Sequence, residues 1–85
     1  MTEGISELDA IGLDCPLPVL RARKRLSSMQ PGQRLAILAS DPMAAIDIPH
    51  LCHQDGHELI ERTESEGNGV RILCFIVERG PNRTA

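Results

Sequence analysis

The sequence predicts an α+β fold, a two-layer sandwich in the order β-α-β-α-β-β with two helices on one face of a mixed four-stranded sheet. Apolar residues recur at helical spacing in two segments, and short segments of strand length lie before, between and after them. Glycine and proline residues separate these segments, as is typical of the ends of helices and strands. Two helices cover one face of such a sheet, so the other face must carry polar residues or be covered by a partner.

The first half of the chain predicts a strand, a helix and a second strand. Residues 7–10 alternate polar and apolar, which is typical of a short half-buried strand, and Gly12 ends this pattern. Residues 16–29 are the expected first helix, which a Pro-Gly pair ends, and its basic residues lie opposite the apolar ones. The apolar positions of this helix are Val19, Ala22, Leu26 and Met29. Residues 34–40 place apolar side chains on both faces, which predicts a central strand.

The second half of the chain predicts a helix followed by a β-hairpin. Asp47 is the expected N-cap of this helix, with Pro49 in its first turn and Gly56 as the residue that ends it. The expected buried positions of the helix are Ile48, Leu51 and Cys52. Residues 59–63 and 70–78 are expected strands, and the Gly-Asn-Gly segment between them is typical of a hairpin turn.

The length of 85 residues predicts a single domain spanning 1–85, with a core at about 7–79 and a loose tail at 80–85. No segment has the pattern of a signal peptide, a lipid anchor or a membrane span. The three cysteines contain no CxxC pair, which disfavours both a disulfide scaffold and a dithiol redox site. We therefore expect a cytoplasmic monomer that does not bind a membrane.

Charge and aromatic content argue against direct binding of nucleic acid. The formal net charge is -3, and Phe75 is the single aromatic residue. Positive charge is nevertheless concentrated on the expected first helix, at Arg21, Arg23, Lys24 and Arg25. These side chains are either a solvated helix face or a surface for an acidic partner, for which Arg21 and Lys24 are the candidate docking residues.

Cys15 is the candidate reactive residue. It lies between Gly12 and the first turn of the expected helix, and Pro16 favours the extended backbone of an N-cap at Cys15. Pro16 and Pro18 lack N–H groups, and the N–H of Leu17 is expected to stay free to point at the sulfur. Because this donor and the helix dipole stabilise a thiolate, we expect the pKa of Cys15 to lie below the value of about 8.5 for a free cysteine. The alternative is an inert thiol that only caps the helix.

The other cysteines and two aspartates have structural explanations. Cys52 lies on the apolar stripe of the second helix and Cys74 alternates with apolar residues in the last strand, so both are expected in the core. Asp41 is explained by the turn that leaves the central strand, and Asp47 by helix capping. None of these residues is therefore expected to carry chemistry.

Three histidines, His50, His53 and His57, lie close together in sequence near Cys52. Their spacing does not form a tetrahedral ligand set, because Gly56 ends the helix between two of them and the others point in different directions. We therefore expect no metal site and no cofactor, and the histidines have no predicted role.

Several short elements together resemble the TusA/SirA/YedF-like sulfur-carrier family. They are Leu8-Asp9, Gly12-Leu13, Cys15-Pro16-Leu17-Pro18, Ser40-Asp41-Pro42, Asp47-Ile48-Pro49, Cys52, Gly56-His57 and Phe75. The resemblance extends from about Glu7 to Arg79, and the CPxP element after a Gly-Leu pair is its most specific part. Members often have a lysine where this chain has Arg79, and the histidines are more numerous than in most members.

The resemblance implies that Cys15 carries sulfane sulfur as a persulfide, supported by Pro16, Leu17 and Pro18. It implies a sulfurtransferase that acts as a carrier rather than a conventional turnover enzyme. The implied donor is a cysteine desulfurase or a rhodanese. The implied acceptor is a protein of tRNA thiolation, molybdoenzyme maturation or sulfur oxidation.

Other readings of the same residues remain open. The chain is alternatively a non-enzymatic regulatory or interaction module that uses its uncovered sheet face. A thiol redox sensor is a further alternative, although no resolving cysteine lies near Cys15 in sequence. Selenium in place of sulfur is a variant of the carrier reading.

Overall fold

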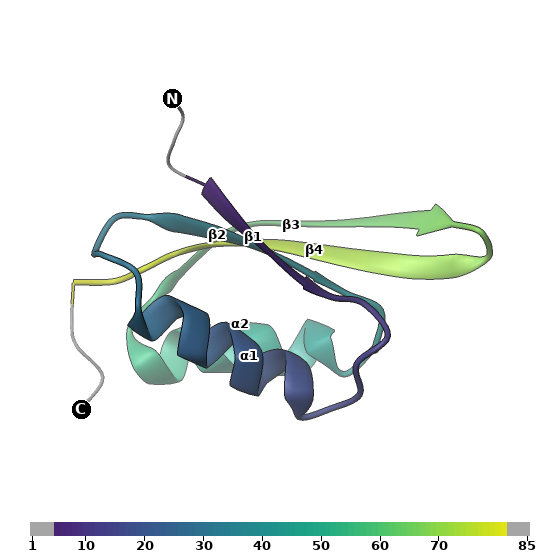
Figure 1. Ribbon diagram of the computed structural model, residues 1–85, viewed down its shortest axis with the longest axis horizontal. Coiled ribbons are helices and arrows are strands. Elements are labelled where there is room, and N and C mark those ends of the chain that lie inside the picture. The colour runs from purple at the N-terminus through teal and green to yellow at the C-terminus, as the bar shows by residue number, and fades with distance from the viewer. Residues whose placement is uncertain (1–4, 82–85) are drawn as a thin grey trace.

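A computed structural model describes residues 5–81, which form two helices and one four-stranded sheet. The elements are β1 (Ile5–Ala10), α1 (Leu17–Ser27), β2 (Arg34–Ala39), α2 (Ala44–Asp55), β3 (Glu58–Gly67) and β4 (Val70–Glu78). The strand order is β1-β2-β4-β3, with β1 and β2 parallel and the other neighbours antiparallel. Both helices lie on the same face of the sheet (Figure 1). The predicted α+β two-layer sandwich is confirmed.

The core lies between the helices and the sheet. Alternate strand residues point toward the helices, because successive side chains of a strand face opposite sides of a sheet. In β4 the inward residues are Leu73, Phe75 and Val77, which are at most 3% exposed. Ala22 and Leu26 of α1 are fully buried against this face, as the helical spacing predicts. Within residues 5–81, neither helix has the length and apolar character needed to span a bilayer.

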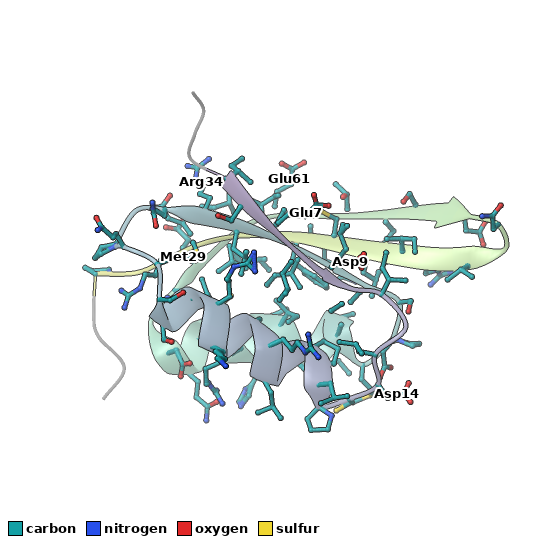
Figure 2. All side chains as sticks on the ribbon, viewed as in Figure 1. Glu7, Asp9, Asp14, Met29, Arg34 and Glu61 are labelled. Atoms are coloured by element: carbon teal, nitrogen blue, oxygen red, sulfur yellow. The ribbon has the colours of Figure 1, made fainter. Side chains whose placement is uncertain are left out.

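The opposite face of the sheet is not covered by any element of the described chain. Figure 2 shows Glu7, Arg34 and Glu61 on this side. The register pairs Leu38 with Cys74 on the same open face, and both side chains are only half-buried. The prediction that Cys74 packs in the core is therefore wrong. Side chains alternate between the two faces of β4, and Leu73 and Phe75, on either side of Cys74 in sequence, point into the core.

The β3–β4 hairpin is longer than predicted. β3 continues to Gly67, and the hairpin extends beyond the helices (Figure 1). Asn68 and Gly69 form a two-residue turn with φ angles of 53° and 77°. Positive φ at both central residues matches the twist of a tight hairpin, and Asn-Gly is the preferred pair for it.

The start of α2 differs from the prediction. The helix begins at Ala44 because Asp41 organises the turn before it. Oδ1 of Asp41 accepts a hydrogen bond of 3.0 Å from the N–H of Met43. Asp47 is the fourth residue of α2, so its assignment as N-cap is wrong, and Pro49 lies inside the helix rather than in the first turn. Gly56 ends the helix with a φ of 78°, as predicted.

The segment that follows β4 is anchored to the helix layer. Arg79 is 8% exposed, and its Nε donates a hydrogen bond of 2.9 Å to the carbonyl oxygen of Leu26. Gly80, expected as the first residue of a loose tail, is instead buried, and its N–H donates to Nδ1 of His57 at 3.0 Å. Residues 82–85 of the expected tail lie outside the described residues.

Candidate functional site

Cys15 lies in the loop between β1 and α1, at the edge of the sheet where β1 and β2 both end. Because these strands are parallel neighbours, the loops that follow them lie side by side. The N–H of Gly12 donates to Oγ of Ser40 at 2.8 Å, and the N–H of Cys15 donates to Oδ2 of Asp41 at 2.7 Å. Two hydrogen bonds therefore hold the cysteine loop against the loop that follows β2.

Asp41 uses both carboxylate oxygens in this arrangement. Oδ1 accepts from the N–H of Met43 and Oδ2 from the N–H of Cys15. These two bonds, with the bond from Met43 as the larger contribution, lower the pKa of Asp41 below its ordinary value. Asp41 is therefore a charged clamp that joins the start of α2 to the cysteine loop.

The side chain of Asp47 reaches the sulfur from α2. Sγ of Cys15 donates a hydrogen bond to Oδ2 of Asp47 at 3.1 Å. This bond is the main cause of a raised pKa of the Cys15 thiol, followed by partial loss of water around the sulfur and by the charges of Asp47 and Asp41. The expected lowering of the pKa is wrong, because the sulfur lies against the Asp47 carboxylate, which disfavours the thiolate.

The residues after Cys15 begin the helix but do not donate to the sulfur. The N-cap position is Pro16 rather than Cys15, and the Cys15–Pro16 peptide bond is cis. The N–H of Leu17 donates to the carbonyl oxygen of Asp14 at 2.8 Å, so the prediction that it stays free is wrong. Pro18 is buried on the inner side of α1, whereas Leu17 is 43% exposed. These residues shape the turn that leads from Cys15 into α1.

A groove of about 200 Å³ runs from Cys15 between α1 and α2. Its other lining residues are Pro16, Val19, Arg23, Asp47, His50, Leu51 and Gln54. Nε of Arg23 donates a hydrogen bond of 2.8 Å to Oδ2 of Asp55, with which it forms an ion pair. Pockets that enclose a drug-sized ligand measure about 300–1,000 Å³, so this groove suits a side chain or a small group next to a partner's sulfur.

The candidate docking residues lie on α1, the helix that follows Cys15. Arg21 and Lys24 are exposed and border a shallow hollow together with Leu17 and Leu20. The two leucines are 43% and 50% exposed. The helix that begins after Cys15 therefore presents apolar and cationic side chains on one outer surface.

The other two cysteines differ sharply from Cys15. All three are free, but only Cys15 is exposed. Burial, and next the charge of Asp55, raises the pKa of Cys52 to about 11. Cys52 is therefore an unreactive part of the core, as predicted, while Cys74 is half-buried on the open sheet face.

The histidines are divided between two places. His50 lines the groove at Cys15, whereas His53 and His57 line a hollow beside Gly80, where β4 ends. Burial is the main cause of a lowered pKa of His57, whose Nδ1 accepts from Gly80. Among residues 5–81, no group of three or more His, Cys, Asp or Glu side chains is arranged to hold a metal ion.

Two site residues were missed as functional candidates. Asp41 and Asp47 were explained by a turn and a helix cap, yet both contact Cys15. The available signal was their position in the Ser40-Asp41-Pro42 and Asp47-Ile48-Pro49 elements, which accompany the CPxP element in the sequence. Their contacts with Cys15 span 26 and 32 residues of chain, which no local pattern specifies.

The fold and the site define a small α+β protein in which one of three free cysteines is exposed, beside two carboxylates. The family model described as "Sulfurtransferase TusA" matches residues 6–74. The chain is 46% identical over 67 residues to the sulfur carrier protein TusA of Allochromatium vinosum, a match covering 79% of this chain and 88% of that protein. The crystal structure of a SirA-like protein from Desulfitobacterium hafniense matches with a TM-score of 0.68 and 27% identity, covering 85% of this chain and 95% of that one. The chain belongs to the sulfurtransferase TusA family.

Proposed function

We propose that the protein is a cytoplasmic sulfur carrier that accepts sulfane sulfur on Cys15 and passes it to an acceptor protein. The observation that carries this proposal is the single exposed thiol, held by Asp41 and Asp47 at the start of α1 in a chain of the TusA family. The name of the Allochromatium vinosum relative, a sulfur carrier protein, supports the same role.

The proposed reaction is a pair of thiol–persulfide exchanges. In loading, the Cys15 sulfur attacks the outer sulfur of a donor R–S–SH, the donor S–S bond breaks, and the products are Cys15–S–SH and R–SH. In delivery, an acceptor thiol attacks the outer sulfur of Cys15–S–SH and becomes the persulfide, while Cys15 returns to the thiol. Each step conserves atoms and electrons, so the carrier needs no cofactor.

The proposed donor is a cysteine desulfurase or a rhodanese, and the acceptor is a protein of tRNA thiolation, molybdoenzyme maturation or sulfur oxidation. Arg21 and Lys24 are proposed to guide docking to acidic surfaces of these proteins. Substitution of both residues by glutamate should slow loading by a desulfurase and leave loading by glutathione persulfide unchanged. Equal loading of the variant and the original protein by the desulfurase would remove this docking role.

A carrier fits the site better than a redox sensor does. A sensor needs a second cysteine to resolve the sulfenic acid, and neither of the other two cysteines lines the groove at Cys15. Cys52, one of the two cysteines available as resolving residues, is 3% exposed. A persulfide exchange, in contrast, takes place in a complex with a partner that positions the reacting sulfurs.

The experiment that tests the proposal is loading by a cysteine desulfurase with cysteine as the sulfur source. We expect the intact protein to gain the mass of one sulfur atom, located on Cys15 by peptide mapping. Cys15→Ser should gain none, whereas Cys74→Ser, which removes the half-buried cysteine of the open face, should load like the unmodified chain. Sulfur gain by Cys15→Ser to the same extent would refute the carrier proposal.

A second candidate function, a protein-interaction module, is favoured by the open face of the sheet. Its half-buried apolar residues lie on the two central strands: Ala36, Leu38, Ile72, Cys74 and Ile76. Glu7 and Glu61 lie on the flanking edge strands, so this face suits a partner with an apolar centre and basic margins. In complementation, such a module should tolerate Cys15→Ala and fail with Ile76→Glu, the reverse of the result expected for a carrier.

A further inference from the structure

One carboxylate of the described chain lies within hydrogen-bonding distance of the reacting sulfur. Oδ2 of Asp47 is 3.1 Å from Sγ of Cys15, and Sγ is the donor of this bond. The carboxylate comes from the first turn of α2, on the opposite side of the groove from α1. Its position is that of a proton acceptor for the thiol, a contact within the reach required for general base catalysis.

The other charged groups near Cys15 have different partners. Asp41, in the turn before α2, uses both oxygens on backbone N–H groups. Arg23, from α1, is held by Asp55. His50, from α2, lines the groove without a hydrogen bond to Sγ, and the Asp14 side chain in the cysteine loop makes no hydrogen bond or ion pair within residues 5–81.

We propose that Asp47 is the general base of the loading step, taking the proton of the Cys15 thiol as the donor persulfide approaches. This inference rests on the proposed carrier function. The S–H bond of Cys15 breaks toward Oδ2, the sulfur forms a bond to the outer sulfur of R–S–SH, and the donor S–S bond breaks. R–S⁻ leaves and takes a proton from solvent, and Asp47 later returns its own proton to solvent.

The arrangement has a consequence for selectivity. Without a donor, the hydrogen bond and the neighbouring charges keep Cys15 in the thiol form, which is a poor nucleophile toward oxidants and alkylating agents. A donor persulfide that reaches the sulfur finds the proton acceptor already in contact. Because a carboxylate is a much weaker base than a thiolate, we expect a contribution near the low end of general base catalysis, about 100-fold or less.

The test compares Asp47→Asn with the unmodified protein in single-turnover loading by glutathione persulfide across pH. At about pH 6, where unassisted thiolate is scarce, the variant should load about 10- to 100-fold more slowly. At pH values above the raised pKa of Cys15 the difference should close, because both proteins then form thiolate without help. Taking the ratio of the two rates at each pH cancels the ionisation of the donor.

Two matched variants and one absorbance measurement separate this role from simpler ones. Asp14→Asn removes a negative charge beside Cys15 without touching the sulfur and should load like the unmodified protein at every pH. Asp47→Glu keeps the carboxylate and should recover part of the loading at low pH. The ultraviolet absorbance of the thiolate, measured against the matching Cys15→Ser protein, should show a lower pKa of Cys15 in Asp47→Asn.

The outcomes distinguish the general base from the carrier function itself. A loading rate of Asp47→Asn that is reduced by the same factor at every pH would assign Asp47 a structural role and overturn the proposal. Faster loading of this variant at every pH would mean that Asp47 only suppresses the thiolate, which also overturns it. Failure of the unmodified protein to load would instead remove the carrier function, on which the proposal depends.

Discussion

The Oδ2 atom of Asp41 accepts a hydrogen bond of 2.7 Å from the backbone N–H of Cys15, across 26 residues of chain. The bond joins the loops that follow two parallel strands, so the position of the Cys15 sulfur depends on a residue of the neighbouring loop. The same carboxylate organises the turn that starts α2, the helix that carries Asp47. One side chain therefore places both the thiol and its hydrogen-bond acceptor.

Asp41→Ala should reduce the rate of persulfide formation on Cys15 about tenfold at neutral pH. The substitution frees the cysteine loop, and small displacements of reacting groups cost rate by that order of magnitude or more. Loading by glutathione persulfide, followed by mass spectrometry, measures the effect. Asp14→Ala, which removes an exposed carboxylate from the same loop, is the control, and equal rates for the two variants would contradict the clamp role.

The clamp also predicts a pH dependence of stability. The pKa of Asp41 is lowered in the folded protein, so its stabilising contribution is present above the unfolded value of about 3.9 and is lost as pH falls through the folded value. Urea unfolding between neutral and strongly acidic pH should therefore show a decline in stability on the acid side. In Asp41→Asn this part of the decline should be absent, and an unchanged acid dependence would show that Asp41 does not contribute to it.

Gly80→Ala should destabilise the fold by about 1–3 kcal/mol, because a Cβ atom at this position would collide with the carbonyl oxygen of Gly56. The nearest atoms all belong to the backbone of Gly56 and His57, so no flexible side chain can move aside. Gly67→Ala is the matched control, since a Cβ there meets no atom within 4 Å. Denaturant midpoints of the two variants measure the difference, and similar midpoints would mean that the segment after β4 is free to shift.

Arg79→Met should lower the free energy of unfolding by about 2–3 kcal/mol, since it removes charged hydrogen bonds to buried carbonyl groups. Nε of Arg79 bonds the carbonyl oxygen of Leu26 and Nη1 bonds that of Gly80. Arg71→Met, at a side chain that is 68% exposed, should change stability by less than about 0.5 kcal/mol. If urea unfolding gave the same loss of stability for both variants, the hydrogen bonds of Arg79 would not be what stabilises the fold.

Local patterns were sufficient for most of the architecture. The spacing of Ala22 and Leu26 predicted the buried side of α1, and the Gly56 stop and the Asn68-Gly69 turn were found where expected. The error at Cys74 has a physical cause. The strand that contains Cys74 carries apolar residues on both of its faces. The sequence pattern therefore did not show which of these faces the helices cover.

The position of Cys15 in an exposed turn before α1 was predictable from the sequence, because a cysteine next to prolines at the start of a helix is a local feature. Its ionisation was not readable, since the pKa of a thiol responds to charges within a few ångströms regardless of their distance in sequence. Asp41 and Asp47 come within reach of Cys15 only when β1 and β2 pair in parallel and α2 packs beside α1. Folding thus converts a thiol expected to ionise easily into one held in its protonated form by a neighbouring carboxylate.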